Sequence, residues 1–246
     1  MKGVMLGINP EIRFLDVSHG ITPFDVMDAA FVLRQAIPYY PEGTIHLVVV
    51  DPGVGTARRG VALGYDGRFF VGPDNGVFAL LLGDADPDEI VVLDREASYR
   101  TPSPCNTFHG RDIFAPAAAR LASGSSLQDI GTPVDALQRL HWALPIDDSQ
   151  GIRGWIVHID HFGNCITNIP RTLFYDRQKG RIAKCYVGNS ILNGVHATYG
   201  AVDVGEPLLL FGSEEFLEIS VNTGNAADLL HIRRGTPVNI VFLDDR

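Results

Sequence analysis

The sequence lacks any hydrophobic run close to the roughly 18 residues that a membrane-spanning helix requires. Its opening segment, MKGVMLGINP, also lacks the apolar stretch of a secretory signal peptide. Basic residues are in the minority, since 20 Lys and Arg stand against 29 Asp and Glu, which gives a net charge of −9. This balance argues against nucleic acid and against an anionic membrane as partners. We therefore expect a cytoplasmic protein in which local groups hold any anionic ligand.

Cysteine is scarce as well, with only Cys105, Cys165 and Cys185 in 246 residues. Their number is odd, their spacing is wide and no CxxC pair occurs, which argues against a disulfide framework and against a zinc site. We interpret them as buried thiols, and we expect neither a metal ion nor a cofactor.

Residues 1–143 alternate strand-like and helix-like segments, which predicts an α/β domain with a largely parallel sheet. Thr22 followed by Pro23 supplies an N-cap and a first-turn proline ahead of a run with helical spacing. The predicted elements are strands at 12–17, 45–50 and 89–94, a hairpin at Asp66-Gly67, a helix at 26–37, a short helix after residue 76, and a helix that begins near 112–116.

The character of the chain changes from about residue 141, where the turn-rich segment LPIDDSQGIRG predicts a linker. Residues 152–246 then consist mostly of strand-like segments, with one helical pattern at 225–232. This pattern predicts a smaller β-rich, barrel-like C-terminal domain.

The segment DPGVGTARRG (51–60) follows a predicted buried strand, and ligands of open α/β sheets gather at the carboxyl ends of strands. Its glycines permit tight backbone geometry, while Asp51 and Arg58 supply a carboxylate and a fixed positive charge. The loop does not match the phosphate-binding pattern GxxxxGK[ST]. A turn with a surface ion pair is the alternative interpretation.

The segment NTFHGRDIF (106–114) places His109 before a predicted helix. The partial positive charge of a helix N-terminus favours a neutral imidazole, which can accept or relay a proton. A single histidine is more often structural, but Asp51, Arg58 and His109 together could polarise a water molecule.

The segment IDHFGNCITNIP (159–170) combines an acid, an aromatic ring and an amide at the end of a strand. Phe162 could stack on a flat heteroaromatic ring, and Asn164 could pair with the donor and acceptor edge of adenine. A β-turn with a core phenylalanine explains the same residues equally well.

Four segments together resemble the S-adenosylmethionine (SAM) hydrolases, or SAM hydroxide adenosyltransferases, relatives of the fluorinase and chlorinase. The segments are VVVDPGVGTARRG (48–60), FVGPDNGVF (70–78), TFHGRDIFAPAAA (107–119) and IDHFGNCITNI (159–169). The resemblance implies an α/β N-terminal domain, a β-barrel C-terminal domain and a homotrimer. In such a trimer the active sites lie between the N-terminal domain of one subunit and the C-terminal domain of the next.

Carried over by position, the resemblance implies that Asp51, Arg58 and His109 form a catalytic triad. The halogenating relatives have tyrosine in place of Asp51, and the fluorinase has tyrosine and serine in place of His109 and Gly110. An ionised Asp51 repels a halide and orients water, so hydrolysis is favoured over halogenation.

The resemblance also implies residues that contact the substrate. They are Phe24 beside the sugar, Asn75 in the pocket lining, Asp160 on the methionine ammonium, Phe162 and Asn164 on adenine, and Ser213 near the methionine carboxylate. Glu214 takes the place of an arginine of the fluorinase. The family pattern opens about 20 residues earlier, with an edge strand whose aspartate binds the ribose hydroxyls, and loss of such a strand exposes backbone groups.

The predicted function is hydrolysis of SAM to adenosine and L-methionine, by attack of water on the 5′ carbon. The sulfonium group is already an activated leaving group, so no metal or other cofactor is expected. The alternatives are an adenosyl halide synthase and a sensor that binds SAM or adenosine without turnover.

Overall fold

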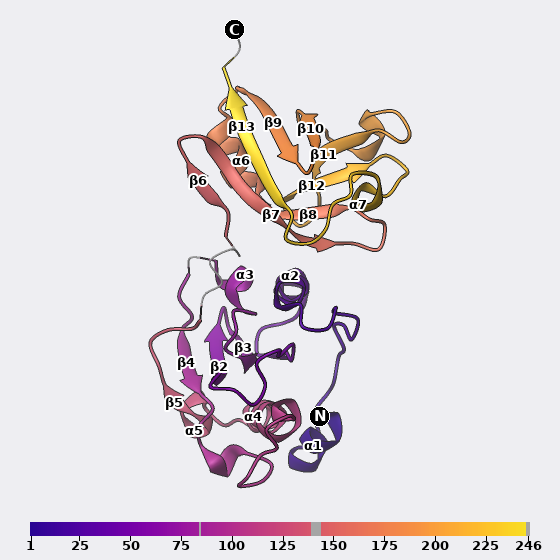
Figure 1. Ribbon diagram of the computed structural model, residues 1–246. Helices are drawn as coiled ribbons and strands as arrows, with labels where there is room; N and C mark the ends of the chain where they lie inside the picture. Colours follow the sequence, from indigo (N-terminus) through magenta and orange to yellow (C-terminus); the bar gives the residue numbers. More distant parts are fainter. Residues whose placement is uncertain (84, 139–143, 245–246) are drawn as a thin grey trace. The chain divides into compact units, whose positions relative to one another are not determined.

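The computed structural model describes residues 1–83, 85–138 and 144–244 (Figure 1). The chain divides into two compact units, Met1–Leu140 (the N-terminal unit) and His141–Arg246 (the C-terminal unit). No helix in the described parts of the chain is long and apolar enough to cross a membrane.

The N-terminal unit is built on a five-stranded mixed sheet with the strand order β1-β3-β2-β4-β5. Its strands are β1 (Ile45–Leu47), β2 (Gly60–Tyr65), β3 (Arg68–Pro73), β4 (Glu89–Val92) and β5 (Thr132–Pro133). Only β1 and β3 pair in parallel among the described strands, so the prediction of a largely parallel sheet needs correction. The predicted hairpin at Asp66-Gly67 is the reason. Both turn residues have positive φ, which reverses the chain tightly and makes β2 and β3 antiparallel.

Helices cover both faces of this sheet, with α2 and α3 on one side and α4 and α5 on the other (Figure 1). Their bounds are α1 (Lys2–Ile8), α2 (Val26–Ala36), α3 (Ala79–Leu82), α4 (Ala115–Ala122) and α5 (Leu127–Ile130), with 3-10 turns η1 (Ile37–Tyr39) and η2 (Glu96–Ser98) and a π-helical turn η3 (Gly110–Phe114). The predicted helix at 26–37 is confirmed, but Asp25 rather than Thr22 is its N-cap and accepts a hydrogen bond from the Asp28 amide. Residues 12–17 form no strand.

The alternation of side chains along the strands divides the core of the N-terminal unit into two clusters. Ala62 packs with Val71 and Val91 in the cluster of α4 and α5, while Val61 and Leu63 pack in the cluster of α2 and α3. Because successive side chains of a strand point to opposite faces, β2, β3 and β4 each contribute to both clusters. The sheet is therefore buried on both sides, which holds its strand ends in fixed positions.

One histidine is enclosed in this core. His46 of β1 is 5% exposed, its ring stacks on Phe70 with centroids 5.0 Å apart, and Tyr40 contacts it edge-on. Its Nε2 has no hydrogen-bond partner within the described residues. Burial, and secondarily the nearby charge of Arg68, lowers the pKa of His46 to about 4.

We predict that His46 makes the protein sensitive to acid. Above the ordinary histidine pKa the ring is neutral in both states, so His46 causes no loss of stability there. Below that value the unfolded chain binds a proton that the folded ring resists down to its pKa of about 4, so stability falls across this window by about 3 kcal/mol. Urea unfolding between pH 7 and pH 4 measures the effect, and His46→Phe should remove this part of the pH dependence. Equal pH dependence in both proteins would contradict it.

The C-terminal unit is an eight-stranded antiparallel sheet that curves into a nearly closed barrel, which confirms the predicted barrel-like domain. Its strands are β6 (Ile146–Asp148), β7 (Gly151–Ile159), β8 (Cys165–Pro170), β9 (Ile182–Val187), β10 (Ser190–Asn193), β11 (Pro207–Phe211), β12 (Phe216–Val221) and β13 (Pro237–Leu243). Its helical segments are α6 (Arg171–Gln178), η4 (Tyr199–Ala201) and α7 (Ala226–Leu229).

Two predictions need correction, one for the start of this unit and one for a cysteine of the N-terminal unit. The linker expected from about residue 141 lies partly outside the described residues, and from Ile146 onward it forms β6, a turn and the start of β7. Cys165 and Cys185 are buried, as expected, and burial raises the pKa of each thiol to about 12. Cys105 is exposed, because it lies in the loop before η3 rather than in a core-facing element.

Candidate functional site

A loop between two strands carries the first two candidate catalytic residues. It belongs to the segment that follows β1, which ends at Leu47, and it returns to the sheet at Gly60, the first residue of β2. In the sheet, β3 lies between β1 and β2. Gly55 at its tip has φ +77° and comes so close to the carbonyl of Asn106 that a side chain would collide with it. The loop is thereby packed against the segment that leads to His109.

Asp51 and Arg58 form a two-point ion pair across the base of this loop. The Arg58 Nε donates to Asp51 Oδ1 over 3.1 Å, and Nη2 donates to Oδ2 over 2.5 Å. The side chains are only 7% and 6% exposed, and the guanidinium lies over the ring of Phe114. The alternative of a surface ion pair is therefore wrong, since this pair is buried and its planar geometry fixes the carboxylate.

His109 completes the cluster. Its Nδ1 lies 2.9 Å from Arg58 Nη2, and because a guanidinium only donates, Nδ1 must accept. We therefore assign the ring proton to Nε2, which makes that nitrogen a hydrogen-bond donor. Burial, and then the charge of Arg58, lowers the pKa of His109, so the ring is mainly neutral near pH 7.

A buried aspartate that the sequence analysis did not single out supports the turn carrying His109. Asp112 is completely buried within η3 and binds the guanidinium groups of both Arg100 and Arg111. It also accepts a hydrogen bond of 2.9 Å from the Cys105 amide. The hydrogen bond from Arg111 is the main reason that the pKa of Asp112 lies far below its ordinary value. Asp112 thus ties the loop before His109 to the turn after it.

The other two candidates of the N-terminal unit have different surroundings. Phe24 is 76% exposed and has φ +69° in the segment before α2. Asn75 binds backbone at both ends of its amide, because Nδ2 donates to the Val50 carbonyl and Oδ1 accepts from the Val77 amide. The amide of Asn75 therefore braces the loop of Asp51.

In the C-terminal unit, Asp160 organises the turn between β7 and β8. One of its oxygens accepts from the amides of Phe162 and Asn164, at 2.8 and 2.9 Å, and the other accepts from the Asn164 side chain. This turn presents the Phe162 ring outward, with 73% of the residue exposed. The alternative of a core phenylalanine is therefore wrong, and the ring is free to stack on a ligand.

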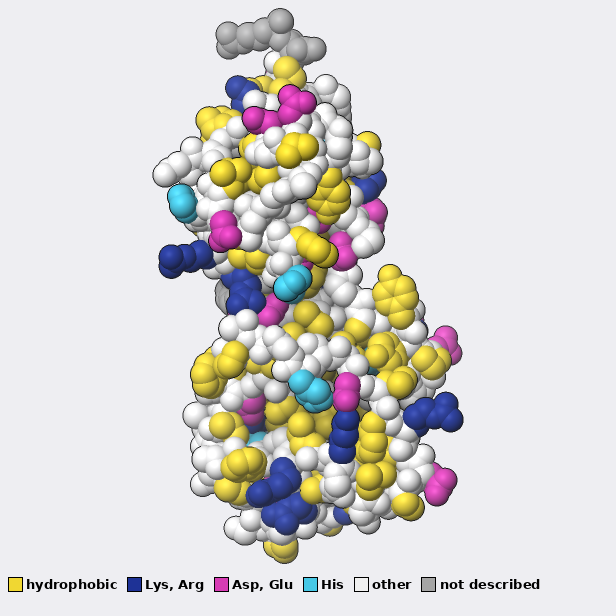
Figure 2. All heavy atoms as spheres, turned by 90° about the vertical axis from the view of Figure 1, so that its right-hand side faces the viewer, with side chains coloured by type: hydrophobic (Ala, Val, Ile, Leu, Met, Phe, Trp, Pro, Cys, Tyr) yellow, Lys and Arg dark blue, Asp and Glu magenta, His cyan; other side chains and the backbone are white. Residues whose placement is uncertain are grey.

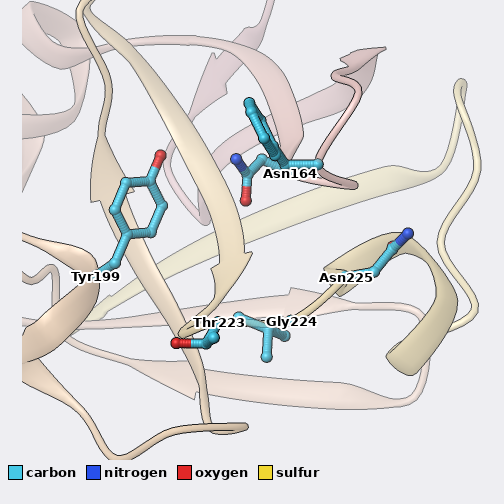
Figure 3. Close-up of a pocket in the computed structure, with 7 residues that line it drawn as sticks. Asn164, Tyr199, Thr223, Gly224 and Asn225 are labelled. Carbon is cyan, nitrogen blue, oxygen red and sulfur yellow. The ribbon is translucent and has the colours of Figure 1, made fainter.

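A pocket of about 440 Å³ opens beside this turn, a size that suits a small molecule (Figure 3). It is lined by Phe162, Asn164, Tyr199, Val221, Thr223, Gly224 and Asn225. The sequence analysis found the first two of these, whereas the others lie far along the chain and carry no local pattern.

Tyr199 is held in this pocket by a buried carboxylate. Its hydroxyl donates to Glu218 over 2.8 Å, and the same Glu218 oxygen accepts from Ser220 over 2.6 Å. Burial and the bond to Glu218 raise the pKa of Tyr199, so its hydroxyl stays protonated. Ser213 donates to Glu214 in the turn between β11 and β12, and neither residue is among the described residues that line the pocket.

The described parts of the chain contain no group of three or more His, Cys, Asp or Glu side chains placed to hold a metal ion.

Comparison with known proteins identifies a family for both parts of the chain. Residues 1–131 match the family described as SAM hydroxide adenosyltransferase N-terminal domain, and residues 154–239 match its C-terminal domain. A protein of Thermus thermophilus named (R)-S-adenosyl-L-methionine hydrolase is 38% identical, over 98% of this chain and 92% of its own. A protein of the same name from Salinispora tropica is also 38% identical, over 97% of this chain and 90% of its own.

A solved structure agrees with these sequence matches. An uncharacterised conserved protein from Thermotoga maritima aligns with a TM-score of 0.85 and 35% identity, covering 97% of this chain and 93% of that one. Both domain matches and both relatives identify enzymes that act on SAM. The chain belongs to the SAM hydroxide adenosyltransferase family.

Proposed function

We propose that the protein hydrolyses S-adenosyl-L-methionine to adenosine and L-methionine. The observation that carries this proposal is the buried cluster of Asp51, Arg58 and His109, which presents a fixed carboxylate and an imidazole donor side by side. The names of its relatives specify the R epimer at the sulfonium, and we propose the same epimer as the substrate here.

The proposed reaction is an in-line displacement at the 5′ carbon. The water oxygen forms a bond to this carbon, the bond to sulfur breaks, and its electron pair neutralises the sulfonium as methionine leaves. The leaving thioether needs no proton, so only the attacking water must lose one, which makes a general base the main requirement.

We propose that two residues of the cluster have different roles in the reaction. Asp51 is the proton acceptor, since each of its oxygens keeps a further lone pair beside the bond from Arg58. His109 Nε2–H is the donor that holds the oxygen of the water, because Nδ1 is occupied by Arg58. The sequence led us to expect that His109 also accepts a proton. We propose instead that it positions the water.

Chromatography of the products tests the proposal. The pure protein is incubated with each epimer of SAM in buffer without halide, and adenosine and methionine are followed over time. Equal amounts of both products support hydrolysis. Tight binding of SAM with no product would support the sensor, and a 5′-halogenated adenosine formed only with added halide would support the halogenase.

We also propose that Phe162 is the platform for adenine, with Asn164 on its polar edge. Replacing Phe162 by alanine should weaken adenosine binding about ten- to a hundredfold, the effect typical of base stacking on an aromatic ring. Calorimetry measures it, and Tyr186→Ala, which removes another exposed ring from the C-terminal unit, is the control. Unchanged affinity in Phe162→Ala would remove Phe162 from the binding site.

We further propose a homotrimer in which the N-terminal unit of one subunit and the C-terminal unit of the next share each active site. Figure 2 shows hydrophobic side chains exposed among charged ones on the N-terminal unit. Leu6 and Ile8 of α1, and Leu15 and Val17 after it, are exposed to between 38% and 67%. Exposed apolar groups of this kind favour association.

The expected result of light scattering is therefore a particle with three times the mass of the chain. Leu15→Glu and Val17→Lys should weaken the assembly if this surface takes part. Val204→Glu, at an exposed apolar position of the C-terminal unit, is the control for adding a charge at an exposed apolar position. A fully active monomer would contradict the shared site.

A further inference from the structure

The loop that carries Asp51 and Arg58 is fastened at both ends to the residues that follow β3. At its start, the Val50 carbonyl accepts a hydrogen bond of 2.9 Å from the Asn75 side chain. At its end, the Arg59 carbonyl accepts a hydrogen bond of 2.9 Å from the Asp74 amide. Because Asp74 and Asn75 are adjacent, one short segment fixes the distance between the two loop ends.

The second of these attachments reaches Arg58 directly. The Arg59 carbonyl also accepts a hydrogen bond of 2.8 Å from Arg58 Nη1. The Arg58 guanidinium is thus held on three sides, by this carbonyl, by Asp51 and by His109. Any movement of the Arg59 backbone would turn the guanidinium and disturb both of its other bonds.

An ion pair with a buried carboxylate keeps the Arg59 backbone in place. Asp74 is 4% exposed, and one of its oxygens binds both Nε and Nη2 of Arg59. Its other oxygen accepts from the Gln138 amide over 2.7 Å, while Arg59 also donates to the Ala136 carbonyl. Both carboxylate oxygens of Asp74 therefore bind groups of the protein itself.

We infer that Asp74 and Arg59 are positioning residues for the reaction, acting on Asp51 and His109 through the Arg59 carbonyl and Arg58. This inference rests on the proposed function. A displacement of about 1 Å in a reacting geometry can cost about a hundredfold in rate. The proposed adenine contacts lie on the C-terminal unit, so the loss should appear in kcat rather than in KM.

Two substitutions test the inference, one in each partner of the ion pair. Asp74→Asn keeps the size of the side chain and an acceptor for Gln138, and Arg59→Gln removes the charge from the more exposed partner. Each should lower kcat for SAM about ten- to a hundredfold with KM changed by less than about threefold. Arg68→Ala is the matched control, because it breaks an arginine–aspartate pair at the opposite end of β3.

A second readout does not depend on turnover. Nitrogen NMR of the imidazole rings reports the tautomer and pKa of His109, whose signals are assigned by their loss in His109→Asn. In the parent protein we expect the Nε2–H tautomer and a lowered pKa. Asp74→Asn and Arg59→Gln should both raise the His109 pKa toward its ordinary value, because Arg58 no longer donates steadily to Nδ1.

The outcomes separate this inference from the proposed function. If kcat and the His109 signals in both variants match those of the parent protein, the inference is overturned. It is also overturned if Arg68→Ala lowers kcat and the melting temperature as much as the two test variants do. If the parent protein releases no adenosine, the proposed function fails. The His109 signals alone then test whether Asp74 and Arg59 position Arg58 and His109. Shifted signals in both variants then support the positioning role, and unshifted signals refute it.

Discussion

Replacing Asp51 by asparagine is expected to lower kcat for SAM hydrolysis by roughly a hundredfold or more. Asparagine has almost the same shape, but its amide cannot take a proton from the attacking water, and general-base assistance is worth about 10² to 10⁴ in rate. SAM affinity should change much less, because the proposed adenine contacts lie on the C-terminal unit. Steady-state kinetics beside calorimetry measures both quantities.

His109 provides the comparison for this result. His109→Ala should also lower kcat by roughly a hundredfold, since it removes the donor that holds the water. His109→Gln restores a side-chain donor and should recover part of the loss if donation by Nε2–H is the role of the ring. Near-normal turnover in both Asp51→Asn and His109→Ala would remove the cluster from the mechanism.

Replacing Asp112 by asparagine should have the largest effect on stability. Asp112 is completely buried, and its substitution leaves Arg100 and Arg111 without their carboxylate and weakens the acceptor of the Cys105 amide. Breaking a buried pair by removing one partner costs about 3–5 kcal/mol, and the partial exposure of both arginines favours the lower end. Urea unfolding followed by circular dichroism measures the loss.

Asp16 offers a control for burial. It pairs with Lys2 over 2.6 Å, but both side chains are 48% exposed. Solvent screens such a pair, so Asp16→Asn should change the unfolding midpoint little. The account of Asp112 would be wrong if the two variants unfolded at the same urea concentration.

The sequence located the candidate cluster because its residues lie at ends of regular elements. Asp51 follows a strongly apolar segment, and His109 precedes an alanine-rich helix. The secondary structure around both residues could therefore be predicted from local patterns. The hairpin at Asp66-Gly67 was readable for the same reason, since its turn type demands two positive φ values. The direction of the Arg58 guanidinium and the tautomer of His109 required the folded geometry.

Other features depend on contacts between distant residues. Residues 12–17 have the apolar content of a strand, yet Ile12 and Phe14 pack on the core without pairing to the sheet. Asp112 looks like an ordinary charged residue in sequence, because its partners Arg100 and the Cys105 amide come from the loop that precedes η3. Tyr199 and Thr223 reach the pocket only through the closure of the barrel, which no local spacing encodes.

Isotope labelling tests the central claim most directly. The protein is incubated with SAM in water enriched in ¹⁸O, and the products are analysed by mass spectrometry. The account predicts adenosine that carries one heavy oxygen at its 5′ position, together with unlabelled methionine and no requirement for halide. Release of adenine instead of adenosine, or adenosine whose 5′ oxygen is unlabelled, would contradict the attack of water on the 5′ carbon.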